Sequence, residues 1–127
     1  MKRIILLGLL LVSCVAAQSY SHMIVLKPDA LSEVAITCGK GDVISIDSRS
    51  VGGNYYQVVV LNPRGLSVFS RGSNDRITGR YEVPVSGVYK VRISNGAGGA
   101  EAVVEYTIIR TYRVERTDNL KLPGSKS

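Results

Sequence analysis

The sequence predicts an all-β fold, an antiparallel β-sandwich of roughly eight strands with jelly-roll-like connections. From residue 23 onward, apolar residues occur in short groups separated by turn residues, and no stretch keeps a helical period. Several of these groups alternate apolar and polar residues, as a strand with one buried face requires. Segments that contain glycine or proline separate them at even spacing, which is typical of a sandwich with short connections.

The first 17 residues have the composition of a secretory signal peptide. Lys2 and Arg3 precede an apolar run at 4–12, and small residues follow up to Ala17. A basic, an apolar and a small-residue segment in this order are the parts of such a leader. The apolar run is shorter than the roughly 20 residues that cross a bilayer. We therefore expect cleavage after Ala17, a mature chain that begins at Gln18 without a transmembrane segment, and a secreted or cell-surface location.

A second processing route is open within the same segment. Residues 11–14, Leu-Val-Ser-Cys, resemble a bacterial lipobox, in which Cys14 becomes the lipidated first residue. Modification of Cys14 would give the protein a lipid anchor. The ordinary cut and the lipidated start are thus two alternatives for the processed N-terminus.

Cleavage after residue 17 would leave a short strand at the new N-terminus. Its apolar part ends at Pro28, and the candidate strand-donor residues are His22, Met23, Ile24, Val25 and Leu26. Such a strand either pairs within its own domain or adds to an open sheet of the next subunit through backbone hydrogen bonds. Head-to-tail contacts of the second kind do not close, and they produce filaments.

The next two strands are predicted at 33–38 and 42–47, with a tight turn between them at 39–42. Cys38 lies on the apolar face of the first of these strands. Because Cys14 is removed or lipidated, Cys38 has no partner for an internal disulfide. We therefore expect a buried free thiol, with a disulfide to another chain as the alternative.

Three longer strands are predicted in the rest of the domain. Residues 55–62 form an apolar run typical of a central strand, and a type I turn follows at 62–65. Residues 87–95 and 101–113 alternate more clearly, and we interpret the glycine-rich segment 95–101 as a hairpin connection between them. The side chains expected to face the core are Tyr89, Val91 and Ile93 on the first strand and Ala102, Val104, Tyr106 and Ile108 on the second.

The chain is long enough for one domain after the leader. We place this domain at residues 18–112 and a charged, turn-rich and mobile tail at 113–127. Without Lys2 and Arg3 the chain has 14 basic and 10 acidic side chains. The basic residues are scattered along the chain rather than gathered in a stripe, so nucleic-acid binding is not predicted.

Residues 83–95 combine an apolar strand, a Gly-aromatic pair and an alternating strand that ends in asparagine. Together with the strand and Pro-Gly turn before them and the long strand after them, these features resemble the GOLD (Golgi dynamics) domain of secretory-pathway cargo receptors. The resemblance covers about residues 33–110. It implies a sandwich that binds other proteins. The coiled coil and membrane span of these receptors have no counterpart here, and Arg92 stands where one of their two paired cysteines would lie.

No pattern of residues predicts catalysis. His22 is the only histidine, and it lies beside the expected cleavage point. No spacing of histidine and cysteine fits a transition metal, so we expect a protein that is not an enzyme and needs no cofactor. Calcium is the one ion to consider, because Asp42, Asp47 and Asp75 lie near loops and carboxylate oxygens are its ligands.

Two functions that involve no catalysis follow from these observations. The first is a protein-binding or structural module at the cell surface, which meets another protein or a glycan. Exposed tyrosines suit such an interface, although we expect at least half of the candidates to fill the core: Tyr55, Tyr56, Tyr81 and Tyr112. The second is a filament subunit that self-associates by donating its N-terminal strand.

Overall fold

The computed structural model describes residues 13–96 and 100–115. Within these residues the chain forms eight strands and no helix. The strands are β1 (Ser13–Leu26), β2 (Leu31–Cys38), β3 (Val43–Ser50), β4 (Tyr56–Leu61), β5 (Ser67–Ser73), β6 (Arg76–Glu82), β7 (Gly87–Ser94) and β8 (Ala102–Glu115). The predicted all-β fold of roughly eight strands is therefore confirmed.

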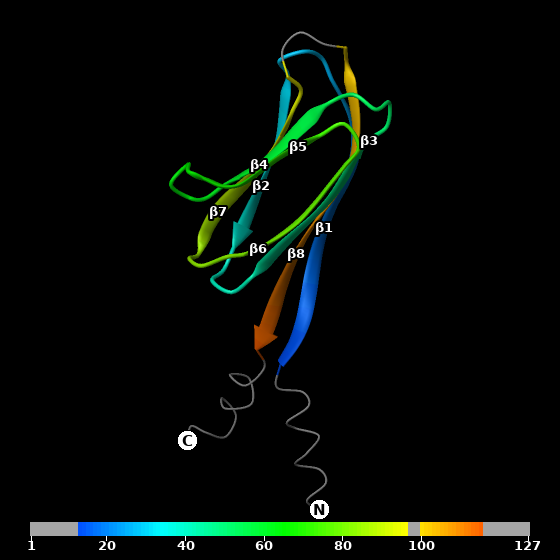
Figure 1. Ribbon diagram of the computed structural model, residues 1–127. Helices are drawn as coiled ribbons and strands as arrows, with labels where there is room; N and C mark the ends of the chain where they lie inside the picture. Colours follow the sequence, from blue (N-terminus) through cyan, green and yellow to red (C-terminus); the bar gives the residue numbers. More distant parts are fainter. Residues whose placement is uncertain (1–12, 97–99, 116–127) are drawn as a thin grey trace, which may run out of the picture.

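The strands form two antiparallel sheets of four strands each. Sheet A has the order β1-β8-β3-β6 and sheet B the order β2-β7-β4-β5, and the two sheets pack as the layers of a sandwich (Figure 1). Only β4 and β5 are both consecutive in the sequence and paired in one sheet; every other connection between described strands crosses to the other sheet. Eight strands connected in this way form a jelly roll, as predicted.

The core consists of alternate residues from both sheets. All the inward-facing residues predicted for β7 and β8 are buried. In β2, Ile36 and Cys38 are buried, and Val34 packs against the core from the same face. Cys38 is a free cysteine, as expected. The two-residue period of these segments thus predicts their buried faces correctly.

An aromatic ring closes the side of the sandwich between β5 and β6. Phe69 of β5 lies directly over Gly79 of β6, where a Cβ atom would overlap the ring. Glycine at this position therefore lets the two edge strands approach each other. The guanidinium group of Arg71 lies 5.2 Å from the centre of the same ring, a distance typical of a cation–π contact.

The hairpin between β4 and β5 has the turn that its sequence predicts. The Gly65 N–H donates to the Asn62 carbonyl at 2.8 Å. The Asn62 side-chain oxygen accepts from the N–H groups of Arg64 and Leu66, both at 2.9 Å. Gly65 has a φ of 82°, which explains why glycine ends this turn.

Two other connections join different sheets. The turn at 39–42 is tight, because the Asp42 N–H donates to the Gly39 carbonyl at 3.0 Å, but it leads from β2 in sheet B to β3 in sheet A. The segment 95–101 likewise leads from β7 in sheet B to β8 in sheet A, so its interpretation as a hairpin is wrong. Turn residues reverse the chain locally, whereas distant pairing partners decide which sheet the next strand joins.

β1 and β8 pair with each other along their whole lengths. The register is continuous, with Ser13 opposite Glu115 and Leu26 opposite Ala102. On its other side β8 pairs with β3, and this pairing ends at Thr111. The outer ends of β1 and β8 therefore form a two-stranded ribbon that projects beyond the sandwich (Figure 1).

The boundaries predicted for the leader and the tail fall within this ribbon. β1 begins before the expected cleavage site after Ala17, and β8 continues to Glu115, past the domain end predicted at 112. The rest of the two predicted segments, 1–12 and 116–127, lies outside the described residues, and the processing of the leader stays a prediction. In the described part of the chain, no helix is long and apolar enough to cross a membrane.

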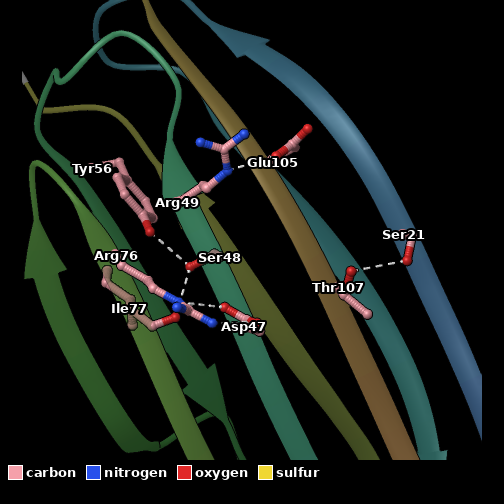
Figure 2. A network of polar contacts seen from close by, with 9 residues as sticks. All are labelled: Ser21, Asp47, Ser48, Arg49, Tyr56, Arg76, Ile77, Glu105 and Thr107. Carbon is pink, nitrogen blue, oxygen red and sulfur yellow. Dashed lines mark hydrogen bonds and ion pairs between the residues drawn. The ribbon is translucent and has the colours of Figure 1, made fainter.

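Two buried tyrosines, Tyr56 and Tyr89, place their hydroxyl groups on polar partners. The Tyr56 hydroxyl lies 2.8 Å from the Ser48 hydroxyl, which donates its own proton to the Ile77 carbonyl at 3.1 Å (Figure 2). Tyr56 is therefore the donor to Ser48. The Tyr89 hydroxyl donates to the Val85 carbonyl at 2.7 Å. These bonds offset the cost of burying phenol groups between the sheets.

We expect the free energy of unfolding to fall at alkaline pH. Burial raises the pKa of Tyr56, Tyr89 and Tyr106 above the ordinary 10.0, and that of Cys38 above 9.0. Their contribution to stability is fully present below the ordinary pKa and is lost as the pH rises through the raised pKa. Urea unfolding between about pH 7 and pH 11 measures this decline. It should be shallower in Tyr56→Phe, and an equal slope in both proteins would contradict the assignment.

Candidate interaction surface

The outer face of sheet A consists of the residues that alternate with the buried ones. The pairing registers of β1, β8, β3 and β6 place these outward residues side by side in rows across the sheet. Side chains directly opposite each other on neighbouring strands contact one another. One row contains Ser21, Thr107, Asp47 and Thr78, and the next contains Met23, Glu105, Arg49 and Arg76.

Ion pairs hold the charged side chains of these rows in place. Arg49 Nε donates to Glu105 Oε1 at 2.8 Å, and Arg76 donates through two nitrogens to the Asp47 carboxylate at 3.0 and 2.9 Å (Figure 2). The hydrogen bond from Arg76 holds the pKa of the Asp47 carboxyl below its ordinary value. Exposed pairs of this kind contribute little to stability, so their main effect is to fix a pattern of charge on the surface.

An apolar patch adjoins the ion pairs at one end of the sheet. Val25 of β1 lies opposite Val103 of β8, and the Val51 N–H donates to the Val103 carbonyl at 2.8 Å. Met23 lies on the same face of β1, two residues from Val25. The side chains of Met23, Val25 and Val51 are 58%, 59% and 46% exposed. We call these four residues the apolar patch.

A shallow depression of about 590 Å³, open to solvent, lies beside the patch. Its lining includes Met23, the two ion pairs, and the hydroxyl groups of Ser21 and Thr107, which are 3.0 Å apart. A second opening, of about 510 Å³, lies between β1 and β2 and is lined in part by Tyr20, His22 and Tyr106. The rings of His22 and Tyr106 meet edge to face with centroids 6.2 Å apart. Among the described residues no hydrogen bond joins His22 to a carboxylate or hydroxyl group.

The predicted donor segment lies in β1 and pairs with β8 of the same chain. Leu26 is buried and Ile24 packs against the core, whereas Met23 and Val25 are exposed on the outer face. His22 is exposed at the margin of the sheet. The sequence left two arrangements open for this strand, and the single chain has the intramolecular one.

The two cysteines lie in different sheets. Cys38 is buried in β2, and burial raises the pKa of its thiol. Cys14 lies opposite Val114 in the projecting ribbon of sheet A. Lipid modification of Cys14 stays a prediction.

The three aspartates considered for calcium do not form a cluster. Asp42 accepts from Arg110 Nε at 2.9 Å, and Asp47 is paired with Arg76. The Asp75 N–H donates to a neighbouring serine hydroxyl in the turn after β5. Within residues 13–96 and 100–115, no three histidine, cysteine, aspartate or glutamate side chains lie close enough to hold a metal ion.

The candidate interface tyrosines have different environments. Tyr55 is 52% exposed, whereas the adjacent Tyr56 is completely buried. Tyr81 packs against the core. The ring of Tyr112 is half-buried, with the guanidinium carbon of Arg110 4.1 Å from its centre. Of the four, Tyr55 alone is largely accessible to a partner.

The apolar patch was not predictable from the sequence. Its residues come from three separate segments, and only the pairing of β1 with β8 and of β8 with β3 brings them together. The alternation of residues 23–26 indicated two faces but not which one is buried. The contact of Arg110 with Asp42 and Gln18 was not predictable for the same reason, since it joins β8, β1 and the turn before β3.

No protein-family model and no curated protein matches this chain, whereas solved structures do. One is a Bacillus endospore appendage, described as a member of a family of disulfide-linked pili. It matches with a TM-score of 0.55 and 10% identity over 81% of this chain and 89% of that chain. Another is PliG of Aeromonas hydrophila, a periplasmic lysozyme inhibitor of g-type lysozyme. It matches with a TM-score of 0.52 and 10% identity over 78% of this chain and 86% of that chain.

A family two carbohydrate esterase from Cellvibrio japonicus has a TM-score of 0.49 and 12% identity, over 79% of this chain and 35% of that chain. The two matches with TM-scores above 0.5, at 10% identity, show a shared fold and nothing finer. None of the three is a GOLD domain. The β-sandwich that the resemblance implied is confirmed, and membership of the GOLD family stays a prediction.

Proposed function

We propose that this protein is an exported, non-enzymatic β-sandwich that acts as a protein-binding or structural module at the cell surface. The observation that supports this most directly is the apolar patch on the outer face of sheet A. Met23, Val25 and Val51 are each about half exposed, and Val103 lies between Val25 and Val51 in the sheet. Contiguous apolar side chains with a polar rim are typical of protein interaction sites.

The surroundings of the patch favour a protein partner. The ion pairs Arg49–Glu105 and Arg76–Asp47 lie beside it and are already formed in the free protein. A partner would therefore meet a fixed pattern of charge, which favours specific recognition. Burial of the exposed part of these apolar side chains would supply affinity, at about 25 cal/mol for each Å² of apolar surface removed from water.

Two similarities agree with this proposal. PliG, one of the solved structures of similar fold, is a lysozyme inhibitor and thus acts by contact with another protein. The resemblance of residues 33–110 to the GOLD domain likewise implies protein binding. The function proposed here requires neither a metal nor a cofactor.

A photo-crosslinking residue at Val25 tests the surface in producing cells. We expect irradiation to link Val25→p-benzoyl-phenylalanine covalently to another polypeptide. The same residue at Val88, which is 43% exposed on the outer face of sheet B, is the matched control and should give much less adduct. The absence of adduct at Val25, or equal adduct at both sites, would contradict a contact surface on sheet A.

The second candidate function is a filament subunit that assembles by donation of its N-terminal strand. The position of β1 at the margin of sheet A favours it, because a marginal strand leaves its sheet without passing through the core. The similarity in fold to an endospore pilus subunit agrees with this candidate.

The size of the native exported material before and after boiling in detergent tests strand donation. Subunits linked by exchanged strands should run as a ladder or a very large species that collapses to one band on boiling. A single small species under both conditions would contradict the filament.

A further inference from the structure

The outer side of β1 has no partner strand in the described part of the chain. β1 is the first strand in the order β1-β8-β3-β6, and its residues pair with β8 on the inner side. In an antiparallel pair, every second residue of an edge strand directs its N–H and C=O groups away from the sheet. This row of backbone groups is a template for a further strand.

The other three edge strands have features that oppose such pairing. β6 contains two arginines and a glutamate, and β2 contains Glu33. β5 contains Arg71, and its pairing with β4 has an irregularity next to Leu61. Charged side chains and bulges are the usual means by which proteins prevent edge-to-edge association.

β1 has none of these protective features. Its 14 residues include no lysine, arginine, aspartate, glutamate or proline. Its register with β8 continues without a shift from Ser13 to Leu26. The exposed side chains of Met23 and Val25 lie on this strand, so the unprotected edge is continuous with the apolar patch. These features persist in Gln18–Leu26, whichever way the leader is processed.

We propose that the free edge of β1 pairs antiparallel with the same edge of a second copy of this chain, which joins two A sheets into one. This inference rests on the proposed protein-binding function and identifies the partner as a second copy of the chain. Charged side chains on an edge strand oppose edge-to-edge pairing. The partner strand that pairs most readily with this edge is therefore uncharged as well. Among the described strands only β1 and β4 lack charged residues, and β4 lies inside sheet B between β7 and β5. Of the strands that the structure describes, the accessible uncharged one is therefore β1, here of a second copy.

Pairing of this kind is two-fold symmetric and closes after two subunits. Each β1 contacts the other through the same surface, as in most homodimers. The antiparallel direction brings the apolar end of one strand, Met23 and Val25, toward the polar end of the other, Ser19 and Ser21. The backbone groups of the two edges then supply the hydrogen bonds of the new interface.

This association differs from strand donation. In donation β1 leaves its own sheet, and Leu26 leaves its own core. In edge pairing β1 keeps its bonds to β8 and Leu26 stays buried as observed. The first arrangement produces filaments, whereas the second produces dimers.

Sedimentation velocity of the purified protein, over about a hundredfold range of concentration, tests the dimer. We expect a monomer–dimer equilibrium in the wild type that Met23→Lys weakens at least about tenfold, or 1.4 kcal/mol. Ser19→Lys places the same charge on β1 and removes no apolar side chain, and it should weaken the dimer similarly. The matched control is Leu31→Lys, at a 56% exposed leucine on the edge strand of sheet B, which should leave the dimer intact.

Hydrogen exchange at the two ends of the concentration range locates the contact. Slower exchange of β1 amides at high concentration, lost in both β1 variants, would support edge pairing. A wild type that stays monomeric, or β1 variants that dimerise as the wild type does, would overturn it. Those results would leave the crosslink from Val25 to a different protein unaffected, so the proposed function and the β1 dimer fail independently.

Discussion

Replacement of Tyr56 by alanine is expected to lower the free energy of unfolding by about 3 to 5 kcal/mol. The ring is completely buried between the sheets, so its removal forfeits apolar burial and leaves a cavity. The hydroxyl donates to Ser48, which in turn donates to the Ile77 carbonyl. Urea unfolding at neutral pH, followed by far-UV circular dichroism, measures the change.

Two further variants separate the causes of this loss. Tyr56→Phe keeps the ring and removes one hydrogen bond, and it should cost about 1 kcal/mol. Tyr55→Ala removes the neighbouring tyrosine, which is 52% exposed, and should change stability by about 0.5 kcal/mol or less. Equal losses in Tyr55→Ala and Tyr56→Ala would mean that the buried face of β4 is assigned incorrectly.

Gly87→Ala is expected to destabilise the protein by about 2 to 5 kcal/mol, for two separate reasons. Gly87 has a φ of 154°, in the region that side chains disfavour. A Cβ atom here would also lie 2.5 Å from Cγ of the Pro63 ring. The proline ring is stiff and belongs to the β4–β5 turn, so the overlap displaces one of the two segments. Thermal unfolding by calorimetry measures the effect.

The matched control for this variant is Gly96→Ala. A Cβ atom on Gly96 has no other atom within 4 Å, so this variant should remain close to the wild type in stability. A Gly87→Ala protein as stable as Gly96→Ala would show that the β6–β7 connection and the Pro63 turn adjust to each other without cost. The packing described for this end of the sandwich would then be wrong.

The strands were predictable because the alternation of apolar and polar residues that indicates a strand lies within the strand itself. Alternation in residues 87–95 and 101–113 identified Tyr89 and Tyr106 as inward-facing, and both are buried. The turn at 62–65 was predictable from the same kind of signal, since Asn62 and Gly65 act within a few residues of each other. Where the run is more continuously apolar, as at 55–62, the alternation is lost, and the sequence could not show which of Tyr55 and Tyr56 is buried.

The candidate surface depends on contacts that are distant in the sequence. Val25 and Val103 are neighbours only because β1 pairs with β8, and Arg76 reaches Asp47 only because β6 pairs with β3. The same is true of the connections at 39–42 and 95–101, which join two sheets. No local sequence pattern predicts which strands become neighbours in a sheet.

The sequence by itself determined that the chain forms strands, roughly how many, and which face of most strands is apolar. Those properties follow from the two-residue period of side chains and from turn residues, both of which act over a few positions. Only the tertiary structure decided that β1 lies at a margin of sheet A, with Met23 and Val25 exposed and its outer edge unpaired within residues 13–96 and 100–115. The physical reason is that strand order and register result from the packing of the whole core, to which residues far apart in the chain contribute together.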